Sequence, residues 1–381
     1  MTAIPVNPEI LVWARSLRCL SLEEAADRLN IEPTVLEKLE AGETQPSLSL
    51  FEDIAAKYRL PQATLFSKNS PRAPTLPNDY RTVGGHSPQH SFEFSVAYSA
   101  VDNLRRILSI ISEEDAEAVD ASLPTYDKKL DPEFVAASER ERLGIRSNYP
   151  IDWASHEAFN RWRAIIESQG IPVFLQKFPI DDCRGFTINN DNGRPIIVIN
   201  KSEEFRSARI FTLIHEYCHL LIGEPGLSDL EGSNSVEAYC NKFAAAFLMP
   251  QDTLRLLIKQ WPNSPVEWPD KDIIRWASRL KVSRIALALR LESLGLAPKG
   301  FSQRYNWYSG YTPRNTSSSG GDPIATTLSE LGSTFTSAIF QAYERGVISR
   351  SSAAEYLGVG SDHFDRVGSY VEKHRGLAIV E

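Results

Sequence analysis

Apolar residues recur at helical spacing through the first 66 residues and predict a run of short helices. The expected ranges are 10–17, 21–29, 33–41, 49–58 and 61–66. Ser21 is placed to cap the second helix, and Glu24 three residues later completes a capping box. Gly42 is expected to end the third helix, and Pro46 precedes the fourth. The N-terminus is therefore predicted to form a compact helical unit.

Helical spacing continues beyond residue 90, interrupted by a short stretch of strand pattern. We expect helices over 92–112, 132–143, 153–169, 211–221, 235–249, 270–280 and 283–294, and three more within 328–375. A strand is expected over 171–178, and 185–189 with 194–200 form a hairpin about the turn-forming residues 190–193. The fold class is a multidomain, mainly α protein with an α+β core carrying a small β-sheet.

Proline-rich and Ser/Gly-rich stretches suggest where these elements divide into domains. The stretch 71–77 is rich in proline, and 312–323 has the composition of a flexible linker. The expected division is 1–70, a linker 71–90, a central domain 91–308, a flexible linker 309–325 and a small helical domain 326–381. Within the central domain, 171–250 forms the core and 270–295 a helical pair.

Charge and cysteine content exclude several classes of protein. The chain has 381 residues and a net charge of −8, which argues against binding to nucleic acid through bulk charge. Its four cysteines are scattered without CxxC spacing, so neither a zinc ribbon nor a disulfide framework is expected. The sequence shows no signal peptide and no run of about 18 apolar residues, so we expect a cytoplasmic protein without membrane contact.

Candidate chemistry is concentrated in one HExxH motif within the apolar helix expected over 211–221. On a helix that turns about 100° per residue, His215 and His219 share one face and can bind the same Zn²⁺. Glu216 lies beside them, where it can act as general base on water. A chance HExxH has a probability of roughly 1 in 100 in a chain of this length. Gly223 is placed as the C-cap of this helix.

A catalytic zinc usually has three protein ligands, and Glu237 is the best candidate for the third. It falls in the first turn of the next predicted helix, which Pro250 ends. Asn241 lies one turn further on the same face and can orient the Glu237 carboxylate. The alternative is that Glu237 only complements the helix N-terminus. Arg209 and Tyr239 are weak candidates for stabilising an oxyanion.

Two of the cysteines fall close to these ligands in the sequence. Thiolate is a strong zinc ligand, which makes Cys218 and Cys240 alternatives to the carboxylate. Cys218 is rotated about 100° from His219 and Cys240 about 300° from Glu237, so neither joins the ligand face as well as the acid does. We therefore interpret both as reduced structural thiols.

Three ordered segments resemble the ImmA/IrrE family of bacterial and phage zinc metallopeptidases. They are GFTINNDNGRPIIVIN, FTLIHEYCHLLIG and VEAYCNKFAAAFLMP, within about 185–250. The resemblance implies a zincin-like core in which His215, His219 and Glu237 bind zinc and Glu216 is the catalytic base. This chain departs from the family pattern at Cys240, where alanine is commoner, and at Tyr217-Cys218, where small residues are commoner.

The N-terminal segment SLEEAADRLNIEPTVLEKLEAGETQPS resembles the XRE (Cro/CI-type) helix-turn-helix family, whose third helix enters the DNA major groove. Thr34 and Lys38 are the candidates for groove contact. However, residues 1–66 hold six basic and ten acidic side chains, so phosphate contacts are few and DNA binding is expected to be weak. Recognition of a protein, or dimerisation, is the alternative role.

Three functions follow as alternatives. The first, implied by the resemblance, is an endopeptidase that cleaves a helix-turn-helix repressor or antitoxin, and so controls a mobile-element, toxin–antitoxin or stress-response operon. The second is a toxin with a metallopeptidase fold that a cognate antitoxin neutralises. The third is a DNA-binding regulator whose zinc site is not catalytic. A homodimer is compatible with each.

Overall fold

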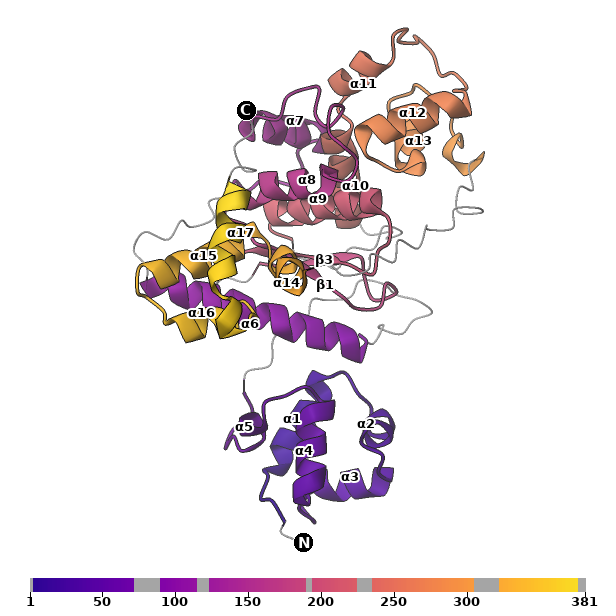
Figure 1. Ribbon diagram of the computed structural model, residues 1–381. Coiled ribbons are helices and arrows are strands. Elements are labelled where there is room, and N and C mark those ends of the chain that lie inside the picture. Colours follow the sequence, from indigo (N-terminus) through magenta and orange to yellow (C-terminus); the bar gives the residue numbers. More distant parts are fainter. Residues whose placement is uncertain are drawn as a thin grey trace. The chain divides into compact units, whose positions relative to one another are not determined.

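The computed structural model describes residues 3–71, 90–114, 123–189, 194–224, 235–304 and 322–375. Two compact units divide the chain, one of residues 1–77 with 82–103 and the other of 78–81 with 104–381. The described residues are mainly helical and include one three-stranded sheet (Figure 1). This confirms the mainly α class with a small sheet. The hairpin turn 190–193 and most of both predicted linkers fall outside the described residues.

The first unit contains the five predicted N-terminal helices. They are α1 (Pro8–Leu17), α2 (Leu22–Leu29), α3 (Pro33–Glu40), α4 (Leu48–Lys57) and α5 (Gln62–Leu65), and α6 (Phe92–Glu114) begins in this unit. Ser21 and Glu24 form the predicted capping box at the start of α2. Leucine, isoleucine and alanine side chains from these helices form a common buried core. The expected helical pattern of residues 10–66 is therefore confirmed to within one or two residues at most ends.

The second unit begins with helices and then forms the sheet. Its elements are α7 (Pro132–Arg142), α8 (Ala158–Glu167), β1 (Val173–Gln176), β2 (Gly185–Ile188), β3 (Ile196–Asn200), α9 (Arg206–Ile222), α10 (Ser235–Leu248), α11 (Gln251–Leu257), α12 (Asp270–Leu280), α13 (Arg284–Ser293), η1 (Ser302–Arg304), α14 (Pro323–Leu331), α15 (Ser333–Glu344), α16 (Arg350–Tyr356), η2 (Ser361–His363) and α17 (Asp365–Arg375). The predicted strand and both arms of the predicted hairpin are confirmed. Helix α11 was not predicted. Pro250 was interpreted only as the end of the preceding helix, but it is also the N-cap of α11.

The sheet has the strand order β1-β3-β2, with β1 parallel and β2 antiparallel to β3. Every residue of β2 and β3 is buried. Ile197 and Ile199 of β3 belong to the hydrophobic core that α8, α9 and α10 share. On the alternate positions, Phe174 of β1 packs edge-on against Phe335 of α15. The sheet is therefore covered on both faces, and α9 lies against β2 and β3.

The last four helices belong to the same unit, and α14 and α15 contact the sheet. Helix α14 lies along β1, and Glu167 of α8 accepts hydrogen bonds from the backbone N–H and hydroxyl of Ser333, at 3.1 and 2.5 Å. Gly332 separates α14 from α15 with φ of +85°, a conformation that favours glycine. The prediction of three helices in this segment was wrong. Over the described residues 322–375 the structure has four α-helices, because the break at Gly332 divides the first predicted helix into α14 and α15. The predicted domain boundaries stay predictions.

None of the described helices combines the length and the apolar character that crossing a lipid bilayer requires.

Candidate metal centre

Helix α9 carries the HExxH motif through the centre of the second unit. Its residues from Thr212 to Ile222 are all buried, because the helix packs against the sheet on one side and against α8 and α10 on others. It ends as predicted at Gly223, whose φ of +67° gives a left-handed C-cap. His215 and His219 are 0% and 1% exposed. The two imidazoles therefore lie in the protein interior, where each needs a polar partner.

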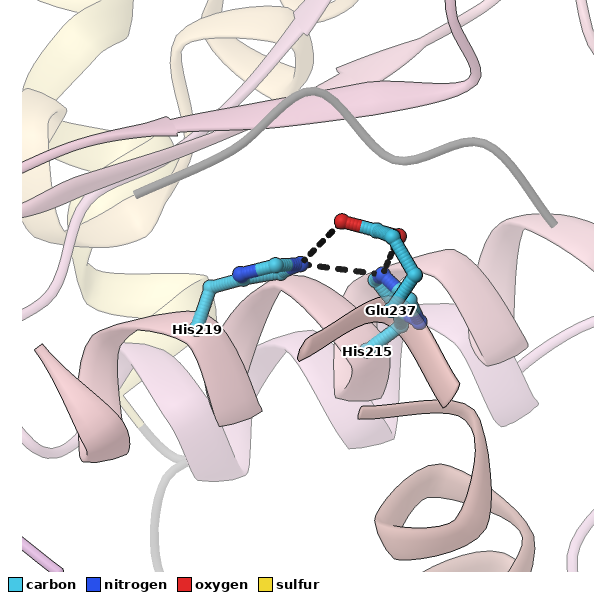
Figure 2. A group of neighbouring side chains, drawn as sticks. All are labelled: His215, His219 and Glu237. Carbon is cyan, nitrogen blue, oxygen red and sulfur yellow. Dashed lines mark hydrogen bonds and ion pairs between the residues drawn. The ribbon is translucent and has the colours of Figure 1, made fainter. Parts of the chain in front are cut away.

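The structure brings together the three residues that the sequence predicts as metal ligands. Glu237, in the first turn of α10, places Oε2 3.1 Å from His215 Nε2 and Oε1 3.3 Å from His219 Nε2. The two Nε2 atoms are 3.1 Å apart, and the three donor atoms lie within 4.8 Å of one another (Figure 2). Two imidazole nitrogens and a carboxylate that converge in this way fit a single metal ion.

Both imidazoles are oriented by a hydrogen bond at their other nitrogen. His215 Nδ1 donates to Oδ1 of Asn241 at 2.9 Å, and His219 Nδ1 donates to the carbonyl of Glu224 at 2.7 Å. Such bonds fix the tautomer that leaves Nε2 free for a metal. The expected contact of Asn241 with Glu237 is replaced by this bond to His215. The role of Glu224 was not predicted from the sequence. The signal for it was its position directly after the Gly223 cap, where its backbone carbonyl turns back toward the last helical turn.

The pKa values of the three groups are shifted by burial and by one another. Burial acts to raise the pKa of Glu237, but hydrogen bonds from His215 and His219 outweigh this effect and lower the pKa to about 2. Burial lowers the pKa of His215. Burial also acts to lower the pKa of His219, but hydrogen bonds with Cys240 and Glu237 outweigh it, so this pKa lies well above its ordinary value. Of the two imidazoles, His219 is therefore the one that holds a proton more strongly in the metal-free protein.

Metal affinity is expected to rise with pH, because a ligand must lose its proton to bind. Above about pH 6.5, the ordinary pKa of histidine, His215 is already neutral and Glu237 ionised, so only the proton on His219 is released. The affinity should increase about tenfold per pH unit until the raised pKa of His219 is passed, and then level off. Zinc titrations against a competing chelator at several pH values measure this slope. An affinity independent of pH from 6.5 upward would contradict it.

Glu216 is a residue of α9, and its fully buried side chain packs against the outer strand β2. A Cβ atom added at Gly185 of β2 would lie 3.3 Å from Glu216 Cγ, 2.6 Å from Thr212 Cγ2 and 2.9 Å from the Val198 carbonyl oxygen. Only glycine at this position lets the strand approach the helix so closely. The strand thus packs directly against the side chain of the predicted base.

The other candidates near the motif have different roles in the structure. Arg209 donates to the backbone carbonyls of Glu203 and Lys201, at 2.6 and 2.9 Å. Tyr239 packs against the hydrophobic core. Burial raises the pKa of the Cys240 thiol, so it stays protonated and is a poor metal ligand. The raised pKa supports the interpretation of Cys240 as a structural thiol. An oxyanion-stabilising role for Arg209 or Tyr239 stays a prediction.

The N-terminal candidates for DNA contact are on the surface of the first unit. Thr34 and Lys38 are both exposed on α3. The structure does not test a nucleic-acid contact at either residue.

Three of the six basic residues within residues 1–66 are engaged inside the first unit. Arg15 donates two hydrogen bonds to Glu40, at 2.8 and 2.9 Å. Arg18 is 3% exposed and donates to backbone carbonyls of its own unit. The guanidinium of Arg28 lies 3.7 Å from the centre of the Phe92 ring. These side chains are less available for phosphate contacts than the sequence alone suggests.

Comparison with known proteins places the metal centre within a recognised domain. Residues 166–292 match the family Peptidase_M78, the IrrE N-terminal-like domain. The matched range includes the sheet and helices α9 and α10, and hence all three residues of the candidate metal site. No curated protein and no solved structure matches the chain. The match supports the ImmA/IrrE family and a metallopeptidase type of function for this region, while the helix-turn-helix assignment stays a prediction.

Proposed function

We propose that this chain is a zinc-dependent endopeptidase with a zincin-like core. The observation that carries the proposal is the convergence of His215, His219 and Glu237 within 4.8 Å in the protein interior, inside the matched peptidase domain. A purely structural zinc site usually has four protein ligands, whereas catalytic sites have three and keep one position for water or substrate. The described residues offer three.

Zinc is the metal that best fits this donor set. Two neutral imidazoles with one carboxylate are typical of zinc peptidase sites, whereas magnesium and calcium prefer sites built of oxygen atoms. His215 and His219 would supply Nε2, and Glu237 a carboxylate oxygen. Asn241 and the Glu224 carbonyl would keep both rings in the binding tautomer.

In the proposed mechanism, Glu216 transfers a proton from the attacking water to the leaving amine. A zinc ion bound there would supply Lewis acid chemistry, which acidifies water and polarises a peptide carbonyl. Glu216 takes the proton from the attacking water and then gives it to the nitrogen of the leaving amine. Its burial against β2 keeps bulk water from competing for the carboxylate. Two of the three residues that would hold the metal, His215 and His219, are therefore neighbours of the proton-transferring residue on α9.

The sheet offers a place for an extended peptide beside this helix. In the order β1-β3-β2, β2 is an outer strand, and it lies directly over Glu216. The other outer strand, β1, packs against α14. A peptide that pairs with β2 would bring its carbonyl groups toward the metal centre. We propose an XRE-type repressor or antitoxin as the protein substrate.

Mass spectrometry of the repressor encoded beside this gene, incubated with the zinc-loaded protein, tests the proposal. The expected result is one or a few specific cleavage products that form with the wild-type chain and do not form with Glu216→Gln. Intact repressor after incubation with the loaded wild-type protein would count against this substrate. Failure to bind zinc would count against the function itself.

DNA binding through residues 1–66 is proposed to be weak, because Arg15, Arg18 and Arg28 are engaged within the unit. The expected dissociation constant for duplex DNA at physiological salt is roughly 10⁻⁴–10⁻⁶ M, typical of contacts to phosphate alone. The slope of log K against log salt concentration is negative, because phosphate contacts release counterions. Lys38→Ala should reduce the magnitude of this slope by about 1. Fluorescence anisotropy with a labelled duplex measures both quantities. Nanomolar binding would instead favour a DNA-binding regulator.

A further inference from the structure

A buried polar network lies on the side of α9 that faces away from the metal ligands. Tyr217 is the residue midway between His215 and His219, so it points about 200° away from each of them. Its hydroxyl donates to Oε2 of Glu139 in α7 at 2.5 Å and accepts a hydrogen bond from Arg142 Nη2 at 2.7 Å. Tyr217 and Glu139 are both completely buried. The bulky residue inside the HExxH motif therefore connects the metal-site helix to α7.

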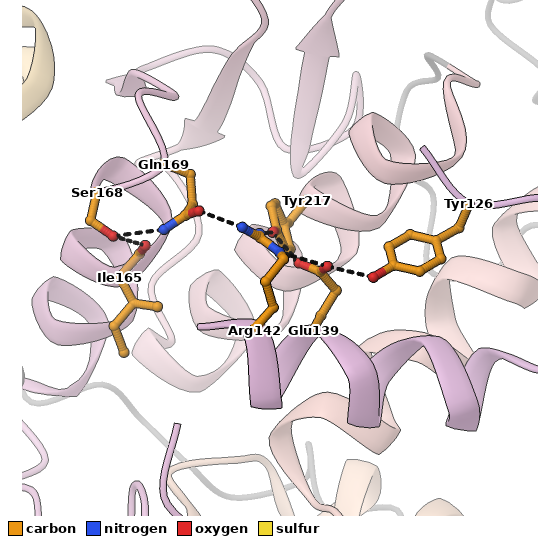
Figure 3. A network of polar contacts seen from close by, with 7 residues as sticks. All are labelled: Tyr126, Glu139, Arg142, Ile165, Ser168, Gln169 and Tyr217. Carbon is orange, nitrogen blue, oxygen red and sulfur yellow. Dashed lines mark hydrogen bonds and ion pairs between the residues drawn. The ribbon is translucent and has the colours of Figure 1, made fainter. Parts of the chain in front are cut away.

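The Glu139 carboxylate is the centre of this network (Figure 3). Besides the Tyr217 bond, Oε1 accepts from Tyr126 at 2.8 Å and from Arg142 Nε at 2.9 Å, and Oε2 accepts from Arg142 Nη2 at 2.8 Å. Burial raises the pKa of Glu139, but the hydrogen bonds from Arg142, Tyr217 and Tyr126 outweigh it and leave the pKa below its ordinary value. An ionised, fully satisfied carboxylate of this kind holds its partners in one arrangement.

The segment that contributes Tyr126 also contacts the C-terminal end of α9. The backbone N–H of Tyr126 donates to the carbonyl of Leu221 at 2.8 Å. Two residues later, Lys128 Nζ lies 2.8 Å from Oε1 of Glu224. The carbonyl of Glu224 is the group that accepts the hydrogen bond from His219 Nδ1. The same segment therefore attaches to α9 directly and to the residue that orients His219.

We propose that Tyr126, Glu139 and Arg142 form a brace that fixes the rotation and position of α9, and thereby act as positioning residues for the metal ligands. The inference rests on the proposed metal function. A metal site requires its ligands to be held within about 0.5 Å of their working geometry. Close apolar packing restrains α9, and the directional bonds to the Tyr217 hydroxyl and the Leu221 carbonyl add a specific restraint on its rotation and on its sliding.

The test compares zinc affinity in variants of the brace with that in a matched control. Glu139→Gln and Tyr217→Phe remove parts of the network, and Tyr126→Phe removes one hydroxyl from a half-buried position where folding is least at risk. Glu167→Gln is the control, since Glu167 is also a buried carboxylate beside an arginine but it holds α15 instead of α9. Affinity is measured by competition with a chromophoric chelator, well below each variant's melting temperature. The visible absorption of the cobalt-substituted proteins reports the ligand geometry.

Brace variants are expected to bind zinc about 10- to 100-fold more weakly, as is usual when groups that orient metal ligands are lost, and to alter the cobalt spectrum. Glu167→Gln should lower the melting temperature and leave both readouts unchanged. If folded Tyr126→Phe and Glu139→Gln bind zinc as tightly as the wild type, or lose no more affinity than Glu167→Gln, the brace is only structural and the proposal is overturned. A wild-type chain that binds no zinc would overturn the proposed function and the brace together.

Discussion

Glu216→Gln is expected to abolish peptide cleavage while leaving zinc binding intact. The amide keeps the shape of the side chain, so its packing against β2 and Gly185 is preserved. It cannot accept the proton of the attacking water, and the loss of a general base typically costs about 10²- to 10⁴-fold in rate. Glu216 is not among the three converging donor atoms, so the metal affinity should stay within about twofold of the wild-type value. Single-turnover cleavage assays and chelator competition on the same preparation separate the two effects.

Glu167→Gln serves as the control here too, because it replaces another buried carboxylate of the same unit far along the chain from the motif. Its cleavage rate should match that of the wild type. Undiminished cleavage by Glu216→Gln would remove the assigned base, and loss of zinc from this variant would mean that Glu216 helps to hold the metal.

The sequence predicted the ligands because their geometry is mostly local. The spacing of His215 and His219 fixes them on one face of a helix, and the apolar run around them places that face in the interior. Glu237 could be predicted from its position in the first turn of the following helix and from family resemblance. The pairing of β2 with β3 was predicted for a similar reason, since short apolar segments on either side of turn-forming residues pair with each other. The parallel pairing of β1 with β3 was not predicted.

Contacts between distant segments could not be predicted in this way. Tyr217 and Glu139 are 78 positions apart, and nothing in the pattern of either helix indicates that the two side chains meet. The partner of Asn241 depends on the relative rotation of α9 and α10, which places its amide at His215 instead of at Glu237. Spacing within one helix says nothing about that rotation. For the same reason, the sequence did not predict that Arg15, Arg18 and Arg28 contact other residues of the first unit.

Glu237→Gln is expected to weaken zinc binding more than any variant of the brace. The amide oxygen is neutral and a poor ligand for zinc, so the ion would keep only His215 and His219 from the described donor set. The variant also removes the negative charge that stabilises the proton on His219, so the pKa of His219 should fall toward its ordinary value. The loss of affinity should therefore exceed the roughly 100-fold that removal of an orienting group costs.

The pH dependence of this variant separates a ligand from a neighbour of the ligands. If Glu237 both binds the metal and holds the proton on His219, Glu237→Gln should have a low affinity that levels off at a lower pH than in the wild type. Chelator competition across the same pH series measures both properties, and circular dichroism checks that the overall helix content of the variant is unchanged. Near-normal affinity in this variant would show that the third ligand is another group. A weak affinity with the wild-type pH profile would place the proton of the metal-free site elsewhere than on His219.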